Sequence, residues 1–293
     1  MNNFLDGKEY IDLDSLYSKE YLENQYKGKG NPFVIDDEVY FVRRITDENR
    51  AYKELLAEEL LNVLEISHVS YKLVKLFGNP CLICKSFFKD DLNIVNGYEI
   101  LEQYNKNKQY DIDYMNNLDM IILAFLDRYK ISQDNYIFQK FTKQLYSLFC
   151  FDILFGNSDR KSDNWTIQEH FYKRYDGKLI LDEINLGTVF DNERIFEDNG
   201  YDYSMGIHYN EMTSANNNFE SIKKQISNNN YLQSILSNMI NKIDEEIFLK
   251  CIYNVEVKIN SSIPIEIKRQ FLEQYHLRVD SLKEICKSNN HKV

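Results

Sequence analysis

The first part of the chain alternates between strand-like and helix-like hydrophobic patterns. Residues 33–45 contain two short runs of β-branched and aromatic residues on either side of an acidic turn. Residues 50–65 change to helical spacing, because leucines recur there on one face. Two further apolar runs, residues 69–77 and 81–88, are separated by a Gly-Asn-Pro turn at 78–80. This pattern predicts the element order β-β-α-β-β.

Helical periodicity dominates the rest of the chain. Residues 93–149 show long helical patterns that are broken by Asn- and Lys-rich turns. The C-terminal third repeats this texture over residues 232–243 and 267–285. The prediction is therefore an α+β fold, with a small β-rich lobe over residues 1–90 and a larger helical lobe over residues 91–293.

Composition and charge then narrow the class of protein. The 293 residues include 35 Lys and Arg against 46 Asp and Glu, which gives a net charge of −11. Proteins that mainly bind nucleic-acid backbones usually have a basic excess, so direct binding of nucleic acid is not expected. A local group of cations can still bind an anionic ligand against this average field.

Targeting and redox signals favour a cytoplasmic protein without a membrane span. The longest apolar run, residues 120–126, is far shorter than the ~20 residues that cross a bilayer. The first residues lack the basic and apolar regions of a signal peptide. The five cysteines are scattered and odd in number, which is typical of a reducing compartment. Delivery as a secreted effector stays an open alternative.

The segment over residues 155–167 combines residue types that phosphoryl transfer requires. Its core is Asp-x-x-x-x-Asn, formed by Asp159 and Asn164, and a second acid, Asp191, follows the strand-like stretch 187–190. In kinase-type transfer one carboxylate orients the substrate hydroxyl, whereas an amide oxygen and another carboxylate hold Mg²⁺ against the phosphates. Asn and Asp supply the oxygen ligands that Mg²⁺ prefers.

The loop Asn157-x-Asp159-Arg160-x-x-x-Asn164, together with Phe190-Asp191, resembles that of the HipA-like serine/threonine kinases. Its Asp-Arg-x-x-x-Asn core is also similar to the phosphatidylinositol 3/4-kinases. Other features of the family occur in the same order along the chain: Gly30-Asn31 before a β-hairpin, the strand 39–43, the helix that holds Glu54, and the strand end 84–87. The resemblance covers most of residues 25–200. It implies a two-lobed protein-kinase-like fold that uses ATP and Mg²⁺.

The resemblance also implies a role for each matching position. Asp159 is expected to be the catalytic base, in a loop that Asn157 and Arg160 complete, and Asn164 and Asp191 are expected to bind Mg²⁺. Nucleotide binding is assigned to the strand cation, its partner on the helix and the glycine loop over the phosphates, while the hinge-like strand end, residues 83–88, is expected to receive the adenine. The residues assigned to nucleotide binding are Arg43, Glu54, Lys27, Gly28, Lys29, Gly30, Asn31 and Lys85.

Two positions depart from the family pattern. Arg43 stands where the strand cation is normally Lys, and a guanidinium is bulkier and bonds with a different geometry. Lys161 stands where the loop often has His. Lys27 and Lys29 are candidates to compensate for the first change. These departures keep open a pseudokinase that binds nucleotide or a partner, and the likeness to lipid kinases keeps open a lipid or small-molecule kinase.

Several of these residues have a second interpretation. Glu54 competes with Glu58 and Glu59 on the same predicted helix. Residues 27–30 could equally form a solvated turn. Asp152 is either a support for the catalytic loop or an exposed acid at the end of a helix.

The remaining expectations concern cysteines and partners. Cys81-x-x-Cys84 has no second Cys or His pair at zinc spacing, so packing in the core is the expected role. The expected partner is a protein substrate with a serine or threonine acceptor. An antitoxin-like or host partner is a further hypothesis that the sequence does not specify.

Overall fold

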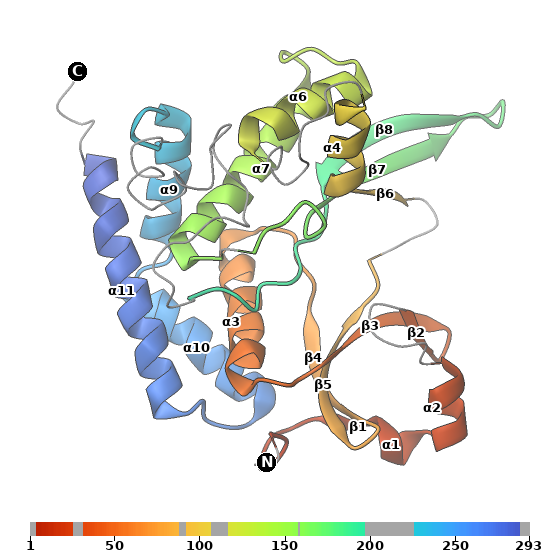
Figure 1. Cartoon of the computed structure of the whole chain (residues 1–293), viewed down its shortest axis with the longest axis vertical. Coiled ribbons are helices and arrows are strands. Elements are labelled where there is room, and N and C mark those ends of the chain that lie inside the picture. The colour runs from red at the N-terminus through yellow and green to blue at the C-terminus, as the bar shows by residue number, and fades with distance from the viewer. Residues whose placement is uncertain are drawn as a thin grey trace.

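The computed structural model describes residues 4–25, 32–87, 92–106, 117–157, 159–196 and 226–287. It is an α+β structure in which a curled sheet near the N-terminus is followed by a helical part that carries a second, smaller sheet (Figure 1). The predicted α+β class is confirmed. The predicted glycine loop, residues 27–31, lies outside the described residues.

The first sheet is five-stranded, with the order β1-β4-β5-β3-β2. The β2–β3 hairpin turns at Asp36 and Asp37, which both adopt a left-handed φ that Asp tolerates better than most residues. The β4–β5 hairpin turns at Gly78, where φ is +72°. The strands are β1 (Ile11–Asp12), β2 (Pro32–Ile35), β3 (Glu38–Arg44), β4 (Tyr71–Leu76) and β5 (Asn79–Lys85).

Helix α3 (Glu48–Leu64) connects the first sheet to the rest of the molecule. Asp47 caps its start by accepting a hydrogen bond from the N–H of Asn49 at 2.9 Å, and Glu65 ends it in the left-handed conformation. With β2, β3, β4 and β5, this helix confirms the predicted order β-β-α-β-β. The helix packs against α10 (Glu245–Ile259), so one hydrophobic core runs from the first sheet to the C-terminal helices.

The two faces of the first sheet bury their side chains against different elements. One face, which includes Val74 and Cys81, is covered by α1 (Leu13–Leu16) and α2 (Lys19–Gln25). The opposite face, which includes Cys84, packs into the core around α3. Cys81 and Cys84 are thus both buried in the core, as expected, but on opposite sides of the sheet.

The second sheet, with the order β6-β7-β8, is a feature that the sequence analysis missed. In β7 the alternation of apolar and polar residues is broken at Glu169. This acid is only 5% exposed, and it bonds to Arg128 and Tyr129. The outer ends of β7 and β8 carry apolar residues that are exposed, Tyr172 and Leu179 among them, so apolar and polar residues do not alternate there with burial. The strands are β6 (Leu92–Asn96), β7 (Thr166–Lys173) and β8 (Leu179–Leu186).

Helices complete the second part of the molecule. The first sheet ends at Lys85 and the second begins at Leu92, on either side of the predicted boundary at residue 90. None of the described helices is long and apolar enough to cross a membrane. The helices after β6 are α4 (Gly97–Asn105), α6 (Leu118–Tyr129), α7 (Tyr136–Phe155), α9 (Asn230–Lys242), α10 and α11 (Ile265–Lys287).

Gly156 ends α7 directly before the predicted catalytic loop. Its φ of +69° is a left-handed conformation that glycine adopts without steric cost. A Cβ at this position would lie 2.1 Å from Cζ of Arg278, a side chain of α11 that is only 2% exposed. The missing side chain therefore lets a buried guanidinium lie against the end of α7.

Replacing Gly156 by alanine should destabilise the fold by about 3 kcal/mol, measured by urea denaturation. About 1 kcal/mol arises from the left-handed backbone, and the rest from displacing the buried Arg278. Gly177 is the matched control, because its φ is +82° and a Cβ there meets no atom within 4 Å. Gly177→Ala should therefore cost about 1 kcal/mol. Equal losses for the two variants would contradict the role given to Arg278.

Candidate active site

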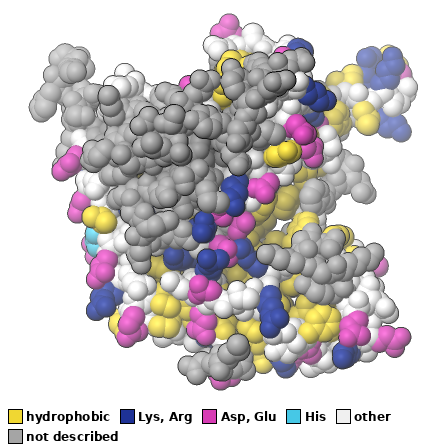
Figure 2. Space-filling view, in the orientation of Figure 1, with side chains coloured by type: hydrophobic (Ala, Val, Ile, Leu, Met, Phe, Trp, Pro, Cys, Tyr) yellow, Lys and Arg dark blue, Asp and Glu magenta, His cyan; other side chains and the backbone are white. Residues whose placement is uncertain are grey.

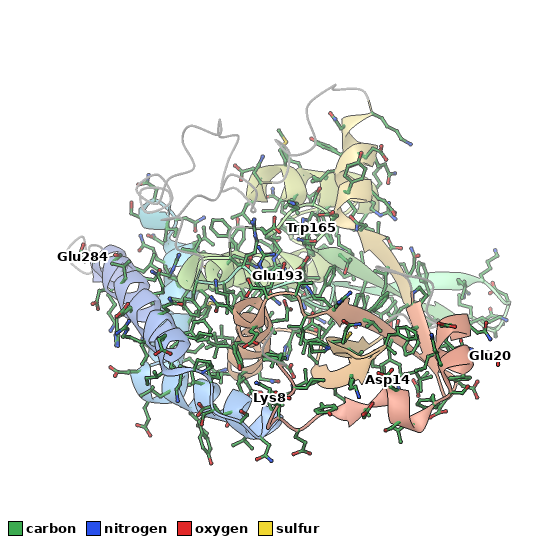
Figure 3. All side chains as sticks on the ribbon, turned by 60° about the horizontal axis from the view of Figure 1, so that its bottom comes forward. Lys8, Asp14, Glu20, Trp165, Glu193 and Glu284 are labelled. Atoms are coloured by element: carbon green, nitrogen blue, oxygen red, sulfur yellow. The ribbon has the colours of Figure 1, made fainter. Side chains whose placement is uncertain are left out.

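Apart from the glycine loop and Lys85, the predicted site residues come from four segments that lie beside one another. These are the end of β3, the first half of α3, the loop 157–164 after α7, and the segment 190–194 after β8. A cavity of about 570 Å³ opens between three of them, β3, α3 and residues 190–193. Glu193 lies beside α3 near the middle of the molecule (Figure 3).

Arg160 holds two of these segments together. Its side chain has no exposed surface, and its guanidinium bonds to both carboxylate oxygens of Asp152 at 3.0 and 3.1 Å. It also donates to the carbonyl oxygen of Phe190 at 2.8 Å, to that of Asn164 at 3.3 Å and to Oδ1 of Asn192 at 2.6 Å. Arg160 was predicted as part of the catalytic set, but its burial makes it a positioning residue.

Asp152 supports the loop from the end of α7. The residue is 4% exposed, so the alternative of an exposed acid at a helix end is wrong. Its carboxylate also accepts a hydrogen bond from Nδ2 of Asn157 at 3.1 Å. Burial raises the pKa of Asp152, whereas Arg160 and Asn157 lower it by bonding to the charged form.

Asn157 and Asn164 fix the backbone around Asp159. Oδ1 of Asn157, which is fully buried, accepts from the N–H of Asp159 at 3.4 Å. Nδ2 of Asn164 donates to the carbonyl oxygen of Asp159 at 2.7 Å. An amide that donates through its nitrogen leaves its oxygen as the remaining acceptor, so Oδ1 of Asn164 is available to a cation.

The Asp159 carboxylate has a buried oxygen that forms ion pairs but accepts no hydrogen bond within the described part of the chain. Its Oδ1 is buried and has no hydrogen-bond partner among the described residues. Two cations lie near this atom, Nζ of Lys161 at 3.3 Å and Nη1 of Arg194 at 3.7 Å. Lys161, which departs from the family pattern, thus forms an ion pair with the predicted base. A buried carboxylate oxygen that forms ion pairs but lacks a hydrogen bond among the described residues fits a site that receives a hydroxyl group from a substrate.

Asp191 adopts a strained backbone. Its φ of +58° is a left-handed value that costs energy for any residue with a side chain. The residues on either side are both bonded to Arg160, through Phe190 and Asn192. The same guanidinium that supports Asp159 therefore also fixes the segment that presents Asp191.

Arg43 bonds to carboxylates through both of its terminal nitrogens. Nη1 lies 2.8 Å from Asp191 and 3.4 Å from Glu54, and Nη2 lies 2.5 Å from Glu193. Glu193 is held in turn by Arg50 of α3 at 3.2 Å. A lysine has one nitrogen and cannot make this two-sided contact, so the arginine suits the acids around it.

The charge of Arg43 is maintained by its neighbours. Burial lowers the pKa of its guanidinium, but the three carboxylates raise it above its usual value. Sequence reasoning missed Glu193, because nothing in the spacing marks the second residue after Asp191 as a partner of β3.

Glu54 is the glutamate of α3 that reaches the site. It is 1% exposed, and its two oxygens accept from the N–H of Asn192 at 2.9 and 3.1 Å. The competing Glu58 instead bonds to Tyr71 and Lys258, and Glu59 bonds to Asn254. Burial raises the pKa of Glu54 to about 7, although Arg43 and the Asn192 N–H favour its charged form.

The Lys85 side chain is not part of this cluster. Lys85 pairs with Tyr40 in the β3–β5 register, whereas Arg43 pairs with Leu82, so the side chains of Lys85 and Arg43 lie on opposite faces of the sheet. Lys85 is 63% exposed and forms an ion pair with Glu38 at 2.6 Å. The structure therefore does not bring the predicted Lys85 side chain to the site.

The end of β5 contacts the site through aromatic rings instead. The ring of Phe87 stacks on that of Phe190 with centroids 5.9 Å apart, and Phe41 of β3 lies 6.0 Å from Phe87. Because Phe190 precedes Asp191, this stack links the strand end to the segment that presents the second acid. The last residue of the predicted adenine site, at position 88, lies outside the described residues.

The donor set fits Mg²⁺ shared with a phosphate. Among the described residues no group of three or more His, Cys, Asp or Glu could hold a metal ion. Asn164 and Asp191 supply one amide oxygen and one carboxylate, and Mg²⁺ is commonly bound by one or two protein ligands together with phosphate oxygens and waters. Arg43 neutralises the Asp191 carboxylate in the arrangement seen here.

Comparison with known proteins identifies the fold. No protein-family model matches the sequence, and no curated protein is significantly similar to it. The structure of the Helicobacter pylori proinflammatory kinase CtkA superposes with a TM-score of 0.59 and 17% identity, over 86% of this chain and 89% of CtkA. HipA, from the Shewanella oneidensis HipA–HipB–operator DNA complex, gives 0.54 and 11% identity, over 90% of this chain and 65% of the HipA chain.

These likenesses show a kinase-like fold. The curled N-terminal sheet and the helical C-terminal part match those of CtkA and HipA, which confirms the fold that the resemblance to HipA-like kinases implied. This chain spans about two thirds of the length of HipA.

Asp152→Asn should lower the free energy of unfolding by about 3 kcal/mol, because it leaves the buried Arg160 charge unpaired. Urea denaturation with circular dichroism measures this loss. Asp163→Asn is the matched control, since Asp163 is exposed in the same loop and should change stability by less than about 0.5 kcal/mol. A loss below about 1 kcal/mol for Asp152→Asn would show that Arg160 does not depend on this carboxylate.

The raised pKa of Glu54 predicts a dependence of stability on pH. With a pKa of about 7 in the folded protein, against 4.5 as its usual value, the folded state binds the proton more tightly than the unfolded chain. The free energy of unfolding should therefore fall as the pH rises from 4.5 to 7. Glu54→Gln should remove this part of the slope, and Glu59→Gln should retain it. Identical slopes for wild type and Glu54→Gln would contradict the raised pKa.

Proposed function

We propose that the chain is an ATP- and Mg²⁺-dependent protein serine/threonine kinase of the HipA-like type. The observation that carries this proposal is the convergence of Asp159, Asn164 and Asp191 around the buried Arg160. The ion pair between Arg43 and Glu54 beside them supports it. Similarity of fold to two proteins, one described as a kinase and the other as part of a toxin–antitoxin system, is consistent with it.

Asp159 acts as the base in this proposal. The acceptor hydroxyl donates its hydrogen bond to Oδ1, which has no hydrogen-bond donor among the described residues. The carboxylate takes the proton as the hydroxyl oxygen bonds to the γ-phosphorus of ATP and ADP leaves. Lys161 and Arg194 lie on the same side of Asp159 and can stabilise negative charge on the transferred group. Most of the rate gain then comes from positioning and charge.

Three residues are proposed to hold the nucleotide phosphates, Arg43 directly and Asn164 and Asp191 through Mg²⁺. Mg²⁺, when bound by Asn164 and Asp191, would neutralise charge on the β- and γ-phosphates. Arg43 bonds to the same Asp191 carboxylate, so a cation held there would replace this contact of Nη1. Glu193 on Nη2 and Glu54 on Nη1 would keep Arg43 in place, while the N–H of Nη1 that faces Asp191 would donate to a phosphate oxygen.

A pseudokinase is the second candidate function. The observation that favours it is that Arg43 already bonds to three carboxylates, which a phosphate must displace. The wild-type protein distinguishes the two functions. A kinase transfers label from ATP to a serine or threonine in itself or in a protein acceptor, whereas a pseudokinase is stabilised by Mg²⁺-ATP without transfer. Lipid and small-molecule acceptors assayed in parallel establish the acceptor class.

Asp159→Asn should reduce phosphoryl transfer by about 10²- to 10⁴-fold, because the amide cannot accept the hydroxyl proton. Its affinity for Mg²⁺-ATP should stay close to that of the wild type. Asp191→Asn should instead weaken the Mg²⁺-dependent part of nucleotide binding. Radiolabel transfer and thermal-shift titration with ATP, with and without Mg²⁺, measure the two effects separately.

Asp163→Asn is the control for both variants, since its carboxylate is exposed in the same loop. It should leave transfer and nucleotide binding unchanged. Normal transfer by Asp159→Asn would refute the role given to this residue. If Asp191→Asn binds ATP with the same dependence on Mg²⁺ as the wild type, the metal site is refuted.

A further inference from the structure

The end of the β7–β8 hairpin projects from the body of the molecule (Figure 1). We call residues 172–179 the hairpin tip, and all eight are exposed. Tyr175 is 96% exposed, Leu179 67% and Tyr172 47%. Basic and hydrophobic side chains gather on this projection at the upper right of Figure 2. Large apolar side chains of this kind are rarely left fully exposed together without an interaction to make.

The tip is cationic on an acidic protein. It carries Lys173, Arg174 and Lys178 against the single acid Asp176, whereas the whole chain has a net charge of −11. Within the described part of the chain, none of these three cations has a carboxylate partner within 4.0 Å. The three charges therefore remain available to an anionic partner.

The apolar side chains of the tip point in more than one direction. Tyr172 pairs with Ile180, and Lys173 pairs with Leu179, so Tyr172 and Leu179 lie on opposite faces of the hairpin. Tyr175 is in the turn that joins the strands, where the guanidinium of Arg174 lies 5.5 Å from its ring centroid. Apolar surface thus surrounds the tip instead of forming one flat face.

The tip also lies beyond the reach of most charges of the body. The last paired positions with buried side chains are Glu169 and Ile184, which are 5% and 1% exposed. The strand continues from Glu169 for four residues to Lys173, which corresponds to about 13 Å. This length exceeds the Debye length of about 8 Å at physiological ionic strength. Dissolved salt therefore largely screens the tip from the acidic charges of the body.

We propose that the hairpin tip docks on an anionic lipid surface. Aromatic side chains beside lysines and arginines are the residues that populate the interface between lipid headgroups and acyl chains. A narrow projection with apolar groups on both faces can insert between headgroups, whereas a stable protein interface requires about 800 Å² from each partner, usually over 20 or more residues. A nucleic-acid base would have to stack on the Tyr175 ring, near which Arg174 already lies.

The expected association is reversible and sensitive to salt. Each basic residue close to an anionic membrane contributes a factor of about five to binding, equivalent to about 1 kcal/mol. The three cations together therefore account for a factor of roughly 100 in the partition coefficient. This proposal does not depend on the proposed kinase function, because it concerns a surface that holds none of the candidate active-site residues.

Sedimentation of the full chain with phosphatidylcholine vesicles, with and without phosphatidylserine, tests the proposal. The wild type should bind the phosphatidylserine vesicles and lose that binding at high salt. The variant K173Q/R174Q/K178Q should bind roughly 100-fold more weakly. The control K19Q/K130Q/R269Q removes the same charge from side chains that are 81%, 75% and 71% exposed elsewhere, and it should bind like the wild type.

Tyr175→Trp reports insertion directly, because the single native tryptophan, Trp165, is only 2% exposed. Its emission should shift to shorter wavelength with phosphatidylserine vesicles and not with phosphatidylcholine alone. Absence of binding by the wild type, or equal loss in both triple variants, would overturn the proposal. Binding of a single-stranded oligonucleotide in preference to the vesicles, lost in the tip variant, would also overturn it and assign the tip to nucleic acid.

Discussion

The geometry of the candidate site depends on one buried guanidinium. Arg160 has no exposed surface, and a charge without water must find a counter-ion and acceptors for its N–H groups inside the protein. Asp152 supplies the counter-ion, and Phe190, Asn192 and Asn164 supply further acceptors. Because these groups belong to the end of α7, the predicted catalytic loop and the segment after β8, satisfying one side chain fixes all three segments relative to each other.

A second set of charges lines the cavity between β3, α3 and the segment after β8. Arg43, Arg50, Glu54, Asp191 and Glu193 form a connected network in which acids outnumber cations. Such a network has an excess of negative charge. If the proposed function is right, bound Mg²⁺ would neutralise this excess. The average charge of −11 thus matters less than the way in which charges are grouped, both here and at the cationic hairpin tip.

Local patterns predicted much of the fold. The β-β-α-β-β order followed from alternation in the strands and helical spacing in α3, because each of these elements buries its own apolar face. The β7–β8 hairpin was missed because Glu169 replaces an apolar residue at a buried position, and Arg128 and Tyr129, which are distant in sequence, satisfy its charge. A pattern based on hydrophobicity cannot represent a buried acid whose partners come from another helix.

The sequence by itself determined which residue types are available for chemistry, through the spacing of Asp159, Asn164 and Asp191 and through the arginine at position 43. Only the tertiary structure decided which glutamate of α3 approaches Arg43, that Glu193 joins it, and that the Lys85 side chain lies on the other face of the sheet. The physical reason is that spacing along one element fixes the direction of a side chain within that element. Its partners across the fold depend on how separate elements pack, and no local pattern encodes that packing.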